Sequence, residues 1–175
     1  QDLPQLSLQL FTSSDDENPL QQGADASLYF SSQAQPAITP TFVLDQERIG
    51  PVVSPEFARQ HRLLESSVSR IQDFAVLYTE SRPQAWPDWL AQQLPHSQLQ
   101  MAQGFPHLYY LLEATAAGMG IGIAPEQLVH ESLLQGRLIA PWGFVSTQAQ
   151  LQLSVLNPAL SADIEKLAHW FTTHL

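Results

Sequence analysis

Residues 105–125, FPHLYYLLEATAAGMGIGIAP, are the stretch that decides the fold. In the first half, leucine and small residues recur at three- and four-residue spacing, which predicts an α-helix with one buried face. Pro106 is typical of a first helical turn, and Gly118 stands where a left-handed glycine usually ends a helix. The second half, residues 119–125, is short, apolar and interrupted by glycine. It predicts a buried strand or extended edge that ends at Pro125.

The residues that follow continue this alternation of helix and strand. A second helix is predicted from about Glu126 to Leu134, and it is followed by Gly136, Arg137 and the apolar residues 138–140. A helix, a glycine cap, a buried strand, a helix and another strand together predict the α/β fold class. Elsewhere the hydrophobic patterns predict strands at 4–11, 24–30, 74–78, 98–101 and 150–156, helices at 17–22, 55–64, 85–94 and 164–175, and a linker at 66–69.

The composition indicates a globular chain that does not bind nucleic acid by itself. Hydrophobic residues make up 44% and charged residues 14% of the 175 residues, which suits one core or two small lobes. Seventeen acidic residues against seven basic ones give a net charge of −10, which repels phosphate backbones. No apolar run approaches the ~20 residues that a membrane helix needs.

The sequence offers no positive sign of catalysis or of a metal or cofactor site. There is no cysteine, no Gly-x-Ser-x-Gly elbow and no His-x-x-x-His spacing among the six histidines. The glycines at 118, 120 and 122 are not followed by Gly-Lys-Ser/Thr, so they predict close packing and not a phosphate loop. The first residues lack a basic start and an apolar core, so they are no secretory signal. A cytoplasmic location is the simplest interpretation, and a processed periplasmic protein would look the same.

Residues 113–142, EATAAGMGIGIAPEQLVHESLLQGRLIAPW, closely resemble the C-terminal effector-binding domain of LysR-type transcriptional regulators. The resemblance implies two Rossmann-like lobes with a cleft between them, as in type 2 periplasmic binding proteins. It places residues 1–66 and 147–175 in the first lobe and 67–146 in the second. The segments GADASLYF at 23–30 and Val52–Pro55 also fit, although many relatives carry an arginine where Tyr29 stands. Family domains open with a strand and a helix before the segment that resembles residues 4–11.

The resemblance also implies a ligand site with contributions from both lobes. Serine and threonine hydroxyls, together with the free N–H groups at a helix N-terminus, suit a small anionic or zwitterionic metabolite. His107 lies in the first turn of the central helix, where relatives often have serine or threonine. It would make a contact that depends on pH, but a solvent-facing histidine fits the sequence equally well. The implied ligand-binding residues are Ser13, Ser14, Ser54, Thr79, Glu80, Phe105, His107 and Gln150.

The function that the resemblance implies is ligand sensing in a transcriptional regulator. Ligand binding would alter the geometry of a homodimer or tetramer, whose DNA contacts belong to an N-terminal helix-turn-helix domain outside these residues. Contacts with RNA polymerase would likewise belong to the intact regulator. The alternative is a solute-binding protein of a transport system, with the same fold and cleft. The Gly-Arg-Leu motif at 136–138 and the lack of a signal peptide favour the regulator.

Overall fold

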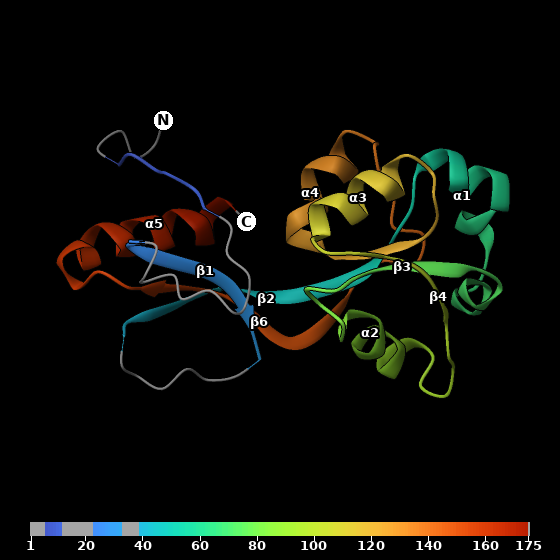
Figure 1. Ribbon diagram of the computed structural model, residues 1–175, viewed down its shortest axis with the longest axis horizontal. Coiled ribbons are helices and arrows are strands. Elements are labelled where there is room, and N and C mark those ends of the chain that lie inside the picture. Colours follow the sequence, from blue (N-terminus) through green and yellow to red (C-terminus); the bar gives the residue numbers. More distant parts are fainter. Residues whose placement is uncertain (1–5, 12–22, 33–38, 175) are drawn as a thin grey trace. The chain divides into compact units, whose positions relative to one another are not determined.

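The computed structural model describes residues 6–11, 23–32 and 39–174 (Figure 1). The chain divides into two compact units: the first contains residues 1–47 and 148–175, and the second contains residues 48–147. The chain passes from one unit to the other within two long strands, β2 (Thr41–Val52) and β6 (Val145–Val155). The predicted lobe boundaries place residues 48–66 and 147 in the first lobe, whereas the second unit contains residues 48–147. The lobe boundaries stay a prediction.

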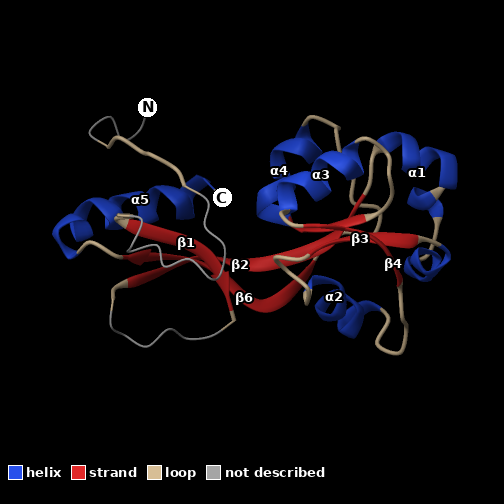
Figure 2. Ribbon diagram, in the orientation of Figure 1, coloured by secondary structure: helices blue, strands red, loops and turns tan. Residues whose placement is uncertain are grey.

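The second unit is an α/β structure built around a short parallel sheet (Figure 2). Strands β3 and β4 pair in parallel, and Ile121 continues the parallel arrangement through a bridge to Val76. Strand β5 pairs antiparallel with the end of β2. Helices α3 and α4 lie on one side of β3, and α2 lies on the other (Figure 1). The elements of this unit are α1 (Pro55–His61), β3 (Ala75–Thr79), α2 (Ala85–Gln93), β4 (Gln100–Phe105), α3 (Leu108–Ala116), β5 (Gly122–Pro125) and α4 (Glu126–Leu134).

Helix α3 ends as the sequence predicts. Gly118 has a φ of 82°, its N–H donates to the carbonyl of Thr115, and the N–H of Met119 donates to the carbonyl of Ala114. This pair of bonds is a Schellman cap, which closes a helix on a left-handed glycine. The predictions of the central helix, of the buried strand ending at Pro125 and of the helix from Glu126 to Leu134 are confirmed.

The first unit has an antiparallel sheet with a helix on one face. Strand β1 (Ala26–Ser31) pairs with β6, and β6 lies next to β2. Helix α5 (Ser161–His174) buries Ile164 and Ala168 against apolar residues of the sheet such as Leu151 and Leu153. The predicted strand at 4–11 is wrong for residues 6–11, which form no strand and are mostly exposed. Alternation alone does not make a strand, because the backbone N–H and C=O groups also need a neighbouring strand.

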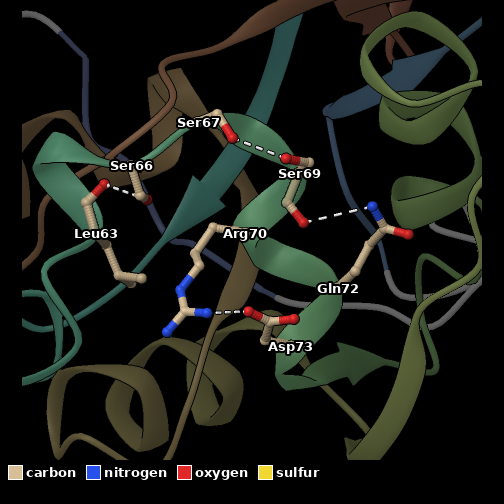
Figure 3. A network of polar contacts seen from close by, with 7 residues as sticks. All are labelled: Leu63, Ser66, Ser67, Ser69, Arg70, Gln72 and Asp73. Carbon is tan, nitrogen blue, oxygen red and sulfur yellow. Dashed lines mark hydrogen bonds and ion pairs between the residues drawn. The ribbon is translucent and has the colours of Figure 1, made fainter.

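The predicted linker at 66–69 contains more structure than its serine-rich sequence suggests. Two short 3₁₀ helices, Leu63–Glu65 and Val68–Asp73, join α1 to β3. Figure 3 shows the polar contacts that hold them: Ser66 donates to the Leu63 carbonyl, Gln72 donates to the Ser69 carbonyl, the hydroxyls of Ser67 and Ser69 pair, and Arg70 pairs with Asp73. Two of these bonds satisfy backbone carbonyls, those of Leu63 and Ser69, and the other two join side chains within the segment.

Candidate functional site

Three of the predicted site residues meet at one edge of the parallel sheet in the second unit. Thr79 is the last residue of β3 and lies opposite Phe105, the last residue of β4. The N–H of Glu80 donates to the Phe105 carbonyl at 2.9 Å, so the loop after β3 is tied to the end of β4. Thr79 is buried and Glu80 is exposed. Ligands of open α/β sheets bind outside the carboxyl ends of the strands, and these residues occupy that edge.

His107 lies two residues after Phe105, at the N-cap of α3. Its side chain is exposed and makes no hydrogen bond to the first-turn N–H groups of the helix. The ring lies 6.1 Å from that of Tyr110 and is tilted against it. Because the first N–H groups of a helix have no partner within the helix, this end of α3 can receive an anion beside His107.

Ser54 lies at the other end of α3. Its hydroxyl accepts a hydrogen bond from the Phe57 N–H at 3.2 Å and so caps α1, and its side chain is buried. With Glu56 and Arg59 it lines an open hollow of about 450 Å³, which residues 116–118 at the end of α3 also line. A helix of nine residues is about 14 Å long. The structure therefore groups Ser54 with the C-terminus of α3 and not with His107.

The remaining predicted residues belong to the first unit. Gln150 lies on β6, is half-buried and stands opposite Ser31 of β1. Ser13 and Ser14 lie outside the described residues. The contributions of these three residues to a ligand site stay predictions.

Two polar residues near the predicted ones were missed from the sequence. Ser81 pairs its hydroxyl with that of Thr79 at 2.9 Å, and it thereby fixes a predicted site residue. Gln152 is buried on β6, two residues after Gln150. A signal for Gln152 was present, because Gln150, Gln152 and Ser154 alternate with leucines along a predicted strand.

Metal-binding clusters and membrane-spanning helices are both absent from the part of the chain that the structure describes. No group of three or more histidine, aspartate or glutamate residues there could hold a metal ion. None of the helices in residues 6–11, 23–32 and 39–174 has the length and apolar character to span a membrane.

Solved structures with a similar backbone define the class of this fold. The effector-binding domain of AmpR from Citrobacter freundii superposes with a TM-score of 0.76 at 22% identity, over 98% of this chain and 84% of that one. The regulatory domain of CrgA from Neisseria meningitidis superposes with a TM-score of 0.63 at 17% identity, over 91% and 81%. The predicted fold class is confirmed: this is a mixed α/β effector-domain fold of the type 2 periplasmic-binding-protein kind.

Sequence comparison then gives the particular family. The chain belongs to the LysR substrate binding domain family, which it matches over residues 1–175. It is 47% identical over 174 residues to the HTH-type transcriptional regulator TrpI of Pseudomonas aeruginosa, covering 99% of this chain and 59% of that protein. It is 27% identical over 145 residues to the HTH-type transcriptional regulator DsdC of Escherichia coli K12, covering 80% and 46%.

These matches confirm the predicted resemblance and settle the coarse function. The chain is an effector-binding domain of a LysR-type transcriptional regulator, and the family is not one of enzymes. The chain spans between 46% and 59% of the length of these two curated relatives.

Proposed function

We propose that this chain is the ligand-sensing part of its regulator and that it binds a small anionic or zwitterionic metabolite. The observation that carries the proposal is the edge where Thr79, Glu80 and Phe105 lie together and the N-terminus of α3 follows at His107. Free N–H groups and a neighbouring histidine attract a carboxylate or phosphate, whereas the Glu80 carboxylate attracts an ammonium group. An amino acid or a similar metabolite presents both charges.

The proposed consequence of binding is a population shift in a dimer or tetramer of the regulator. A ligand that binds one conformation more tightly shifts the protein toward it by its difference in affinity. The shift would change the geometry of the dimer and so the spacing of helix-turn-helix domains, through which alone the protein would contact DNA. Contact with RNA polymerase and action in the cytoplasm are part of the same proposal. The two curated relatives are regulators, which supports this function over a solute-binding protein of a transport system.

A thermal-shift screen tests the proposed site. The chain is heated with amino acids, small carboxylates, nucleotides and sugars, each at millimolar concentration. A ligand that binds only the folded state at 100 times its Kd adds about 2.7 kcal/mol of stability. In a chain of this size each kcal/mol raises the Tm by about 2 to 4 °C.

Three variants then locate the binding. His107→Ala and Thr79→Val are expected to lose most of the shift given by the best ligand. His96→Ala is the matched control, because His96 is also an exposed histidine of the second unit and lies outside the edge. A shift that survives in both site variants would place the ligand elsewhere. A folded chain that responds to no class of ligand would contradict the proposed function.

A further inference from the structure

The loop that follows β3 in the second unit is held by two backbone hydrogen bonds. The N–H of Arg82 donates to the Thr79 carbonyl at 3.3 Å, which closes a turn over residues 79–82. The N–H of Glu80 donates to the Phe105 carbonyl at 2.9 Å and ties the same turn to the end of β4. The turn therefore presents its side chains at a defined place, outside the carboxyl ends of both strands.

The two hydroxyl groups of this turn differ in what they can reach. Thr79 is only 2% exposed and offers almost no surface to a ligand, whereas Ser81 is exposed. Their hydroxyl oxygens lie 2.9 Å apart, which is hydrogen-bonding distance. A hydroxyl group can donate one hydrogen bond and accept others. A bond from Thr79 to Ser81 therefore leaves the proton of Ser81 to be donated outward.

We propose that Ser81 is a specificity-determining residue, which donates its hydroxyl to the anionic group of the ligand, and that Thr79 is the positioning residue behind it. This inference rests on the proposed function and deepens it, because Thr79 then affects binding through Ser81 and not by a contact of its own. A hydroxyl that already accepts a hydrogen bond is a stronger donor, since a chain of hydrogen bonds polarises its members. The buried Thr79 thus both orients and strengthens the contact that the exposed Ser81 makes.

Matched probes test which group of the ligand Ser81 contacts. A hydroxyl binds a charged acceptor more strongly than a neutral one, so the pair should favour a carboxylate over its amide. The probes are the common amino acids and lactate, each compared with its primary amide, and their dissociation constants are measured by titration calorimetry. The carboxylate that binds the wild-type chain most tightly is then measured, with its amide, on the variants.

Ser81→Ala and Thr79→Val each remove one hydroxyl of the pair, and valine keeps the shape of threonine. Each change should weaken binding of that carboxylate by about tenfold or more, because a charge-assisted hydrogen bond is lost or no longer oriented. Thr79→Ser keeps the hydroxyl and should bind like the wild type. Ser67→Ala is the matched control, since Ser67 is an exposed serine of the same unit whose hydroxyl pairs with that of Ser69 (Figure 3).

The double variant Thr79→Val/Ser81→Ala separates positioning from direct contact. If Thr79 acts through Ser81, the double variant binds no more weakly than Ser81→Ala alone. Losses of affinity that multiply in the double variant would show that Thr79 contacts the ligand by itself, and they would overturn its positioning role. Ser81→Ala should also weaken the amide less than the carboxylate. An equal loss for both probes would overturn the assignment of Ser81 to the anionic group.

The contrary outcomes separate the inference from the proposed function. A Ser81→Ala chain that binds like the wild type, while His107→Ala binds weakly, overturns the inference and leaves the proposed function standing. Full affinity in Ser81→Ala, together with a fall of more than about 3 °C in the ligand-free Tm of Thr79→Val, assigns the hydroxyl pair a structural role and also overturns the inference. Binding that survives in both Ser81→Ala and His107→Ala contradicts the inference and the proposed site. A wild-type chain that binds none of the probes contradicts the ligand class of the proposed function, and the inference fails with it.

Discussion

The two units bury their strands in different ways. In the second unit, all four residues of β5 are buried, and Ile123 and Ala124 pack into apolar clusters on the two sides of the strand. In the first unit, the last five residues of β6 are also buried, but Gln152 and Ser154 alternate with apolar residues. Apolar burial on both faces serves stability, whereas buried polar residues cost stability unless they are paired. The comparison indicates that the first unit gives up some packing energy for hydrogen-bonding groups.

The largest effect is expected in the second unit, from Ile123→Ala. Ile123 is fully buried, and its truncation removes apolar contacts and leaves a cavity. We expect a loss of about 3 kcal/mol in the free energy of unfolding, since isoleucine-to-alanine changes in cores cost ~2–5 kcal/mol. Urea unfolding followed by tryptophan fluorescence measures it, because three of the four tryptophans, Trp86, Trp89 and Trp142, lie in this unit. Leu134→Ala, at a side chain that is 71% exposed, is the control and should cost little. Equal losses in the free energy of unfolding for Ile123→Ala and Leu134→Ala would contradict the conclusion that buried apolar packing stabilises this unit.

The same contrast explains what could be predicted from the sequence. Helices α3 and α4 were predicted because apolar spacing and the glycines at 118 and 136 mark their faces and ends. Both signals are local. The strand predicted at 4–11 failed for residues 6–11 because strand formation depends on a neighbour that local alternation does not reveal. In the site, the end of the predicted strand at 74–78 marked the loop with Thr79 and Glu80. Phe105 came from the family resemblance, because the next strand was predicted at 98–101 and β4 continues to Phe105. Ser54 lies beside the C-terminus of α3 because of tertiary packing, and no local pattern in the sequence reveals that packing.

The next effect tests how closely the second unit is packed at Gly50. A Cβ atom on Gly50 would lie 2.2 Å from the Gly143 carbonyl oxygen and 2.8 Å from a ring carbon of Phe144. Because backbone must move to admit it, Gly50→Ala should destabilise the chain by about 2 to 3 kcal/mol. Gly136→Ala is the control: its φ is +67° and a Cβ there would have no atom within 4 Å. Only backbone strain of about 1 kcal/mol should result at that position. The urea midpoints of the two variants are compared. A smaller loss of stability for Gly50→Ala than for Gly136→Ala would contradict the close approach of Gly143 and Phe144 to Gly50.

A smaller effect is expected in the first unit, from Ser154→Ala. The change removes one partner of Tyr29 and of Thr41 and should cost about 1 kcal/mol. Hydrogen–deuterium exchange of peptides from β6 measures it within the first unit. In the double variant Tyr29→Phe/Ser154→Ala the cost should be less than the sum of the single costs, because both changes remove the same bond. Strict additivity would mean that the hydroxyl contact contributes nothing.

The smallest effect is expected where the second unit uses charge on its surface. Arg137 Nη2 lies 2.9 Å from Glu113 Oε1 and joins the end of α4 to α3, but both side chains are about half exposed, at 49% and 46%. Water and salt screen such a pair, so Arg137→Ala should cost less than about 0.5 kcal/mol, and the cost should shrink further in 1 M salt. Arg48→Ala is the companion variant. The partner of Arg48, Glu126, is only 30% exposed, so water and salt screen this pair less than they screen the Arg137–Glu113 pair. A cost for Arg137→Ala that approached that of Ile123→Ala, and that did not change with salt, would show that the α3–α4 contact depends on this side chain. The stability of the second unit would then no longer be attributable to apolar packing alone.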